Sequence, residues 1–264
     1  MEDRDKTLSE PLSALAGSAP IELRRDYLQN VLHELATPLT PLIGYIKLLR
    51  SQSVGELNEL QGKCVDNMHR SVTRLNRLLD DLGHLLQMAS GLYSPEPLEF
   101  DFRMVIQASL AVFEPDAEAE KIELLVQLPD HPVPVVGDEA KLKYAIGHLL
   151  SNAIKFNSAG GKVFVRLLTE NEGASATLEV FDSGVGIRTE DLARVFEPFF
   201  QADHSATRQF GGSGVGLTLA QWVFSMHRGE LGIESPPTAQ PTGHFFRGIR
   251  AFVTLPTAPP VPSE

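Results

Sequence analysis

The sequence is poor in cysteine and in basic residues. Its one cysteine, Cys64, excludes a disulfide within the chain and a cysteine-based zinc site. We therefore expect a reducing, intracellular setting, with Cys64 buried as a small apolar group. The 34 acidic residues outnumber the 23 lysines and arginines, which gives a net charge of −11. Nucleic acids and anionic membranes need a basic surface, so neither is an expected partner.

Long apolar runs are also absent. No segment approaches the roughly 18 continuous apolar residues that span a bilayer. Residues 1–20 lack the basic start and apolar middle of a signal peptide. These absences predict a cytoplasmic protein with no direct insertion into a membrane.

Length and periodicity divide the chain into two domains between flexible tails. The 264 residues are enough for one large domain or two ordinary ones, each with its own core. The Gly- and Pro-containing segment 91–97 separates a region of helical periodicity from one of mixed strands and helices. We predict a tail at 1–20, a helical domain at 21–95, a second domain at 96–256 and a tail at 257–264.

Two apolar seams predict a helical hairpin. Apolar residues alternate at steps of three and four, as in coiled coils and four-helix bundles. They are Leu28, Leu32, Leu35, Leu39, Leu42, Ile46 and Leu49, and then Val65, Met68, Val72, Leu75, Leu79, Leu82 and Leu86. The short connection at 51–56 predicts antiparallel helices, and half of each seam would remain in water. We therefore expect a homodimer in which a second copy completes a four-helix bundle.

The first helix carries a candidate nucleophile. If Leu32 and Leu35 occupy the seam, His33 faces solvent, with Glu34 beside it and Thr37 one turn further on. An exposed imidazole beside a carboxylate can act as a nucleophile. Pro38 and Pro41 follow within the helical pattern and predict a bend next to His33. A surface histidine beside a proline kink is the alternative.

The second segment predicts a mixed α+β sandwich with three polar or glycine-rich patterns. Ser151 to Phe156 ends a predicted helix at 138–156. Asp182 to Ile187 follows an apolar strand, and its carboxylate can accept a hydrogen bond from an exocyclic amine. Gly211 to Leu217 opens a helix, where backbone N–H groups attract phosphate. Taken singly, each pattern is most often only a turn; neither a Walker A loop nor a dinucleotide fingerprint is present.

Five motifs in this order resemble those of bacterial two-component sensor histidine kinases. The segment His33 to Leu39 resembles the H-box, and Leu149 to Phe156 the N-box. The other three are Asp182 to Ile187 (G1 box), Phe196 to Phe200 (F-box) and Gly212 to Leu217 (G2 box). The resemblance covers roughly residues 21–256. It implies a dimeric four-helix bundle for dimerisation and histidine phosphotransfer, followed by a Bergerat-type α/β sandwich that binds ATP.

The resemblance also implies roles for single residues in the ATP site. Asp182 would recognise the adenine amine, with Gly184 and Gly186 shaping its pocket. Asn152 would ligate Mg²⁺ and Lys155 would contact phosphate, with Phe156 ending the same motif. The remaining cofactor-binding positions are Gly212, Gly214, Gly216 and Leu217 around the triphosphate. The loop at 201–211 would be a mobile lid, in which His204 and Arg208 are candidates for phosphate contact.

The implied activity is that of an ATP-dependent protein histidine kinase. His33 would attack the γ-phosphorus while Glu34 accepts a proton, and the phosphoryl group would pass to an aspartate of a response regulator receiver domain. Thr37 matches the family position that orients water, which implies a phosphatase activity toward the response regulator as well. About twenty residues precede the bundle, so we expect the signal to come from an upstream sensor protein or from a sensor domain missing from this chain.

Some residues depart from the family pattern and leave two rival functions open. His148 stands where the N-box usually begins with asparagine, while Leu32 and Ala36 replace a small polar and a basic residue of the H-box. A non-catalytic dimeric scaffold that binds nucleotide or a receiver domain is one rival. An ATPase of the chaperone, topoisomerase or mismatch-repair type is the other, but it needs neither the bundle nor its histidine.

Overall fold

The computed structural model describes residues 21–90, 98–202 and 213–258, which form two compact units that divide after Tyr93. The tail at 1–20 and the proposed domain boundary after residue 95 lie outside the described residues, as do residues 259–264. Each unit is described by itself.

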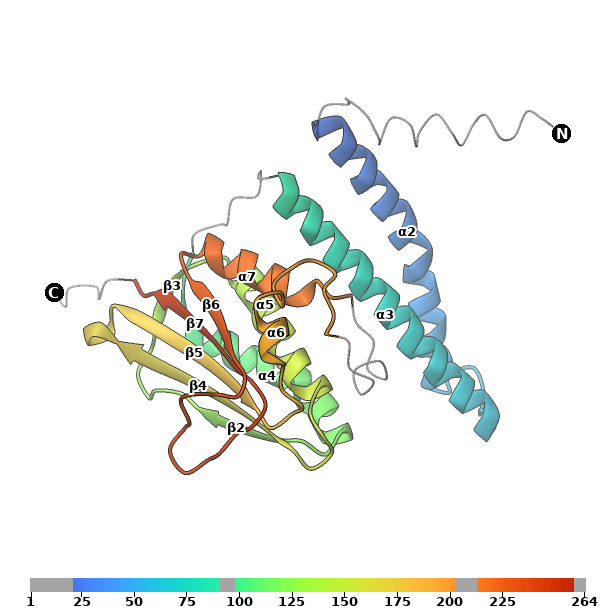
Figure 1. The fold of residues 1–264 in the computed structure, drawn as a ribbon. Coiled ribbons are helices and arrows are strands. Elements are labelled where there is room, and N and C mark those ends of the chain that lie inside the picture. Colours follow the sequence, from blue (N-terminus) through green and yellow to red (C-terminus); the bar gives the residue numbers. More distant parts are fainter. Residues whose placement is uncertain (1–20, 91–97, 203–212, 259–264) are drawn as a thin grey trace. The chain divides into compact units, whose positions relative to one another are not determined.

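The helices and strands of the two units follow one another in the order shown in Figure 1. The first unit holds α2 (Ile21–Arg50) and α3 (Glu59–Ser90). The second holds β1 (Leu98–Asp101), α4 (Phe102–Ala119), β2 (Glu123–Gln127), β3 (Pro134–Gly137), α5 (Glu139–Lys155), β4 (Lys162–Glu170), η1 (Asn171–Gly173), β5 (Ser175–Asp182), α6 (Thr189–Leu192), α7 (Gly216–Met226), β6 (Glu230–Glu234) and β7 (Arg250–Pro256).

The first unit is a helical hairpin, and α2 continues through both prolines. The turn uses Gly55 at φ +127°, a conformation that favours glycine. Asn58 then begins α3 with a reciprocal cap: its Oδ1 accepts from the Gln61 amide at 2.8 Å, and its own amide donates to Gln61 Oε1 at 2.9 Å. None of the described helices is apolar over a stretch long enough to cross a lipid bilayer.

Each predicted seam separates into a buried row and an exposed row. Leu39 and Ile46 of α2 and Val65 of α3 are buried within the hairpin. The exposed row consists of Leu35, Leu42, Met68, Leu75 and Leu82. The prediction that Cys64 is buried was wrong: its side chain is exposed, because it stands one position before Val65 and therefore projects away from α2.

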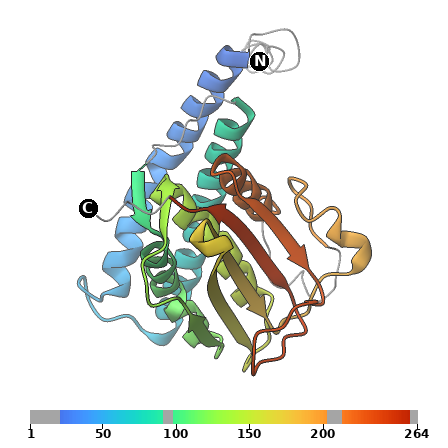
Figure 2. The same cartoon turned by 90° about the vertical axis from the view of Figure 1, so that its left-hand side faces the viewer.

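In the second unit, three helices cover one face of a five-stranded sheet. The strand order is β2-β4-β5-β7-β6, with β2 parallel to β4 and the other neighbours antiparallel. Helices α4, α5 and α7 lie against the same face, as Figures 1 and 2 show. β1 and β3 form a separate antiparallel pair. This arrangement confirms the predicted helical domain followed by an α/β sandwich.

Apolar residues at every second position, Val163, Val165 and Leu167 and then Leu178 and Val180, predict two strands that each bury one face. Val163, Val165 and Leu167 of β4 are all buried in the core beneath the helices, as are Leu178 and Val180 of β5. The predicted helix after Asp138 is α5, and the Asp138 side chain accepts a hydrogen bond from the Lys141 amide at 3.0 Å. The inward-facing residues of β4 and β5 therefore pack with the buried residues of α5 in one core.

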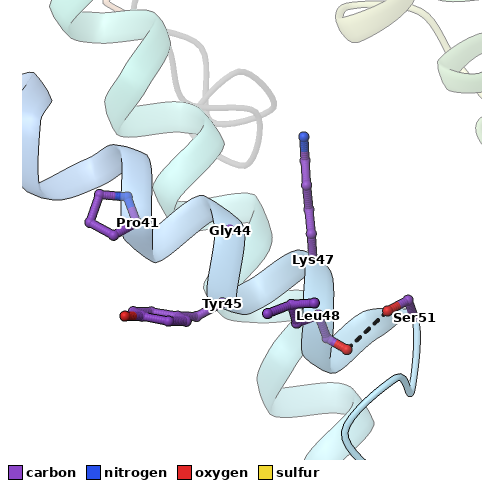
Figure 3. Close-up of a pocket in the computed structure, with 6 residues that line it drawn as sticks. All are labelled: Pro41, Gly44, Tyr45, Lys47, Leu48 and Ser51. Carbon is purple, nitrogen blue, oxygen red and sulfur yellow. Dashed lines mark hydrogen bonds between the residues drawn. The ribbon is translucent and has the colours of Figure 1, made fainter.

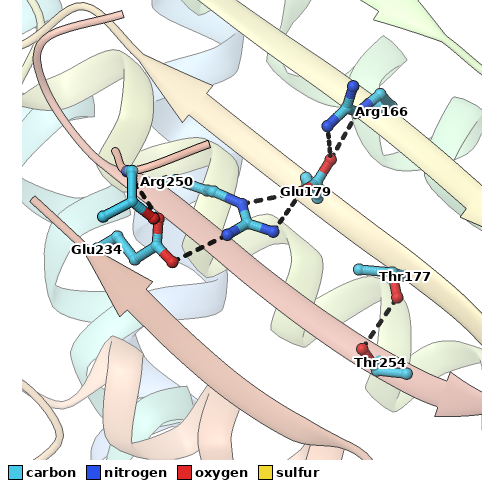
Figure 4. A network of polar contacts seen from close by, with 7 residues as sticks. Arg166, Thr177, Glu179, Glu234, Arg250 and Thr254 are labelled. Carbon is cyan, nitrogen blue, oxygen red and sulfur yellow. Dashed lines mark hydrogen bonds and ion pairs between the residues drawn. The ribbon is translucent and has the colours of Figure 1, made fainter. Parts of the chain in front are cut away.

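The opposite face of the sheet contains an ion-pair network around Glu179. This carboxylate is 1% exposed and pairs with Arg166 from β4 at 2.5 Å and with Arg250 from β7 at 2.6 Å (Figure 4). Arg250 also reaches Glu234 of β6 at 3.0 Å. Four neighbouring strands are thus joined by paired charges on the face of the sheet opposite α4, α5 and α7.

Replacing Glu179 by alanine should destabilise the second unit by about 3–5 kcal/mol, because two guanidinium groups lose their buried partner. Chemical denaturation of the full chain measures this. The control is Glu123→Ala, which breaks the exposed Lys162–Glu123 pair at 2.7 Å on the same sheet and should cost less than about 1 kcal/mol. Equal effects of the two substitutions would contradict a structural role for the network.

Candidate functional site

The candidate nucleophile lies on the solvent face of α2. The side chains of His33, Glu34 and Thr37 are exposed, as the seam predicted. The His33 side chain is exposed, and its ring has no hydrogen bond to any described residue. Thr37 Oγ1 donates to the His33 carbonyl at 2.7 Å. The Glu34 side chain does not bond the ring, since consecutive helix residues project roughly 100° apart.

The second candidate site is built around Asp182 at the end of β5. Its side chain is 5% exposed, and Oδ1 accepts hydrogen bonds from the amides of Gly184 at 2.9 Å and Ile249 at 3.2 Å. No described residue donates to Oδ2. The carboxylate is thus fixed through one oxygen and keeps the other as an acceptor for a ligand.

Burial raises the pKa of Asp182 to about 7, while the two amide hydrogen bonds act in the opposite direction. The carboxyl group therefore changes protonation near neutral pH in the absence of a ligand. A ligand amine that donates to Oδ2 favours the ionised form. The arrangement fits the exocyclic amine of adenine, which is a donor.

Gly184 allows two chain segments to approach beside Asp182. A Cβ at this position would lie 2.4 Å from the carbonyl oxygen of Phe156, so any side chain would displace the end of α5. Val185 donates its amide to the same carbonyl at 3.2 Å. The main-chain turn after β5 is therefore attached directly to the residue that ends the N-box.

The N-box residues lie along the last turns of α5. Asn152 is partly exposed, and its side-chain amide makes no hydrogen bond with the described residues. The Lys155 ammonium lies 4.6 Å from the centre of the Phe156 ring. Asn152 and Lys155 are three residues apart, so both side chains project from neighbouring positions on one helix face. They can present an amide oxygen and a cation to a phosphate chain and its metal.

The second glycine cluster leads into α7. Gly214 has φ +71°, and a Cβ there would lie 2.8 Å from both Phe199 C and Phe200 O. A Cβ at Gly216 would lie 2.7 Å from Nδ1 of His148, so the imidazole packs against the first residue of α7. His148 also meets Tyr144 edge-on at 4.5 Å. The unusual N-box histidine is therefore a packing neighbour of the glycine cluster.

The remaining predicted residues belong to the G2 box, the F-box and the lid, and those that the structure describes contact the core or solvent. Leu217 packs against the hydrophobic core, where it anchors α7. Phe196 packs against the same core, and its carbonyl accepts a hydrogen bond from Thr218 Oγ1 at 2.9 Å. Phe199, by contrast, is 66% exposed and has φ +65°. Gly212 and the lid candidates His204 and Arg208 lie outside the described residues.

The motifs alone did not identify a group of residues that connects the N-box with the G1 box. Asn157 is buried; its Nδ2 donates to the Lys162 carbonyl at 3.0 Å, and its Oδ1 accepts from Ser183 Oγ at 3.0 Å. Ser235 and Gly248, 48 or more residues further along the chain, also reach the G1 segment. Asn157 directly follows the N-box and Ser183 lies inside the G1 box, which was a usable signal; Ser235 and Gly248 carried none.

Two known protein families match the two units separately. Residues 23–91 match the His Kinase A (phospho-acceptor) domain, and residues 137–259 match the histidine kinase-, DNA gyrase B- and HSP90-like ATPases. The first match contains His33 and the second contains Asp182. ATP binding by the second unit follows from this match together with the acceptor geometry of its site.

Curated relatives match over most of the chain. The chain is 31% identical over 218 residues to the sensor histidine kinase GacS of Pseudomonas protegens, covering 81% of this chain and 23% of that protein. It is 33% identical over 229 residues to the circadian input-output histidine kinase CikA of Synechococcus elongatus, covering 86% of this chain and 30% of that protein. The chain thus spans about a quarter of the length of such relatives.

Solved structures are similar as well. The mycobacterial sensor histidine kinase MprB is 32% identical with a TM-score of 0.52, covering 62% of this chain and 99% of that one. Full-length ShkA in complex with AMPPNP has a TM-score of 0.67 at 22% identity, covering 88% of this chain and 46% of that one, and shows the fold alone. With both domain matches and these relatives, the chain belongs to the two-component sensor histidine kinases.

Proposed function

We propose that the chain is an ATP-dependent protein histidine kinase that phosphorylates its own His33. The observation that carries the proposal is the exposed His33 ring, which makes no hydrogen bond to a described residue and stands on the helix of a phospho-acceptor domain. The second unit of the same chain provides a nucleotide site around Asp182. A nucleophile and a phosphoryl donor site are the two parts such a reaction requires.

The chemistry assigns a role to each group. A ring nitrogen of neutral His33 forms a bond to the γ-phosphorus as the bond to the β-phosphate oxygen breaks, and ADP leaves. The other ring nitrogen then releases its proton to Glu34, whose carboxylate is exposed on the next residue. Asp182 binds the adenine amine, and Gly184 and Gly186 allow the turn after β5 to pack closely against Phe156 and Ser235.

Mg²⁺ is the metal we propose for this site, with Asn152 as a protein ligand. Mg²⁺ is commonly held by one or two protein oxygens together with phosphate oxygens and water. A side-chain amide without a described partner on α5 suits this role, and Lys155 supplies charge for phosphate. The metal, when bound, neutralises charge on the phosphoryl oxygens.

A response regulator receiver domain is the proposed acceptor of the phosphoryl group, and α2 offers a surface for it. Pro41, Gly44 and Leu48 lie on the His33 face of the helix, at steps of eight, eleven and fifteen residues. With Tyr45, Lys47 and Ser51 they line an open concavity of about 550 Å³ (Figure 3). An apolar surface directly along the helix from the phosphorylated ring supports docking of a partner there.

Thr37 supports a phosphatase activity in the same place. Its hydroxyl lies one turn from His33 on the exposed face of α2. A hydroxyl there can orient water toward a phosphorylated aspartate of the docked partner. We propose a cytoplasmic homodimer that receives its signal from an upstream sensor protein or from a sensor domain beyond this chain.

The exposed apolar row on the hairpin supports the homodimer. In both helices the exposed positions follow the buried ones by the same three-residue step, and the helices are antiparallel. The row therefore lies along one side of the hairpin, where a second hairpin can cover it. Each fully buried leucine contributes roughly 1.5–3 kcal/mol, so covering the row favours association.

Replacing Leu75 by glutamate should weaken dimerisation by about 100-fold or more, because each interface would bury two carboxylates where it held two leucines. Sedimentation of the full chain at micromolar concentration measures this. Val112→Glu, which alters an exposed apolar residue of α4 in the second unit, is the control. A wild-type chain that sediments as a monomer would show that the homodimer proposal is wrong.

Incubation with Mg²⁺ and γ-labelled ATP tests the function. The proposal expects an acid-labile, base-stable label on the chain, which a candidate receiver domain then removes. Nucleotide binding without any label would favour a non-catalytic scaffold. Rapid ATP turnover with no labelled protein would favour an ATPase of the gyrase or chaperone type.

A further inference from the structure

The long connection between β6 and β7 returns to the Asp182 site through the main chain. It runs from Ser235 to Ile249 and places two amides against one residue: Gly248 N–H donates to the Asp182 carbonyl at 3.1 Å, and Ile249 N–H donates to Asp182 Oδ1 at 3.2 Å. The Asp182 amide in turn donates to the Ile249 carbonyl at 2.9 Å. The position of Asp182 Oδ1 therefore depends on where this connection ends.

One hydroxyl joins the start of that connection to its end and to the G1 turn. Ser235 Oγ accepts from the Ile187 amide at 2.8 Å and donates to the Gly248 carbonyl at 3.0 Å. A serine hydroxyl has one donor and can accept, so both of these bonds are compatible. The Gly248 carbonyl and the Ile249 N–H belong to the same peptide unit. By bonding this carbonyl, Ser235 thus fixes the N–H that donates to Asp182.

The glycine at the turn shows how closely this hydroxyl is enclosed. Gly186 has φ +69°, and a Cβ there would lie 2.9 Å from Ser235 Oγ and 3.5 Å from the Gly248 carbonyl oxygen. Gly248 is similarly constrained, because its own Cβ would lie 2.0 Å from Asp182 Oδ1. The hydroxyl is therefore packed between two segments that both touch the carboxylate.

We propose that Ser235 is a positioning residue for adenine recognition: its hydroxyl holds Gly248 and Ile249 so that the Ile249 amide occupies Asp182 Oδ1 and Oδ2 is directed to the ligand amine. The inference rests on the proposed role of Asp182. Ser235 itself does not contact the nucleotide. It acts by fixing which carboxylate oxygen remains available.

The test compares two nucleotides that differ by one group. Purine riboside triphosphate lacks the 6-amino group of ATP, so the ratio of its dissociation constant to that of ATP reports the amine contact alone. For the wild-type chain we expect a ratio of about 30 or more, in line with a hydrogen bond to a charged group. Ser235→Ala should lower this ratio by about five- to tenfold while changing the affinity for the analogue less than about twofold.

Two further variants complete the experiment. Ser235→Thr keeps a hydroxyl and should restore most of the ratio. Thr238→Ala is the matched control, because its hydroxyl bonds Glu234 Oε2 at 2.8 Å in the same connection without reaching Asp182, and it should leave the ratio unchanged. Thermal unfolding of each variant identifies a misfolded protein; if Ser235→Ala misfolds, Ser235→Cys, which keeps a small polar group, takes its place.

The outcomes separate this inference from the proposed function. A wild-type ratio near one would mean that Asp182 does not read the amine, and both would fail. A normal wild-type ratio that Ser235→Ala leaves unaltered would overturn the role of Ser235 alone. An equal loss of affinity for both nucleotides would also overturn it, because a merely structural hydroxyl has that effect.

Discussion

The substitution His33→Gln should abolish transfer of the γ-phosphoryl group to the chain, with a loss of labelling of at least about 1000-fold. Glutamine keeps a polar side chain on the exposed face of α2 but has no nucleophilic nitrogen, because its amide lone pair is delocalised. The helix should be retained, since glutamine is a good helix former and the exposed His33 side chain makes no hydrogen bond or ion pair with a described residue. Autoradiography after acid and base treatment measures the effect.

His69→Gln provides the matched control, since His69 lies on α3 of the same hairpin and is partly exposed. It should label like the wild-type chain. His33→Gln should still bind ATP, because the site around Asp182 belongs to the other compact unit. Label that persists in His33→Gln would show that another residue is the acceptor, and ATP turnover that persists without label would indicate an ATPase.

The second large effect is expected from Asp182→Asn, which should weaken ATP binding by about 100-fold or more. Asparagine keeps an oxygen for the Gly184 and Ile249 amides but directs an NH₂ donor toward the ligand amine, which is also a donor. A charge-assisted hydrogen bond is lost and two donors face each other. Titration with a fluorescent ATP analogue measures the change in affinity.

The same substitution should not destabilise the protein above neutral pH. The pKa of Asp182 rises from its ordinary 3.8 to about 7 on folding, so between these values the native state holds a proton that the unfolded state has lost. The stability of the ligand-free chain therefore falls as pH rises through this window. Asp182→Asn removes the free-energy cost of ionising the buried carboxyl group. The midpoint of thermal unfolding of the variant minus that of the wild type should therefore be higher at pH 8 than at pH 5.

Asp116→Asn, on the exposed surface of α4, controls for the loss of one acidic charge. It should change neither ATP affinity nor the pH dependence of unfolding. Normal ATP binding by Asp182→Asn would remove the carboxylate from adenine recognition. A relative midpoint that is lower at pH 8 than at pH 5 would show that the carboxylate is not disfavoured by burial.

Much of the local structure could be predicted from the order of residues. Apolar residues spaced three and four positions apart predict helices, because side chains at those spacings share one helix face. The apolar residues at every second position of β4 predict a strand with one buried face, because successive strand side chains point to opposite faces. The Asp138 cap and the start of α7 at Gly216 also follow from short-range chemistry. His33, Asn152 and Asp182 were selected as candidate site residues from the motifs that contain them.

Other features could not be read from local patterns. Which half of each seam is buried depends on the packing of α2 against α3, and Cys64 was predicted on the wrong side of that division. The burial of Glu179 depends on arginines from two neighbouring strands, one of them 71 residues away in sequence. A polar residue in a strand gives no sign of whether such partners will lie beside it.

For this protein, the sequence by itself predicted the two helices of the hairpin, β4, β5, α5 and α7 of the sandwich, and the candidates for phosphoryl chemistry, because periodicity and motif spacing act over a few residues. Only the tertiary structure decided that Asp182 is held through Oδ1, that no described residue donates to Oδ2, and that Ser235 bonds the Ile187 amide and the Gly248 carbonyl. Those contacts join strands and turns distant along the chain, and hydrogen bonding across such distances is set by sheet register and packing.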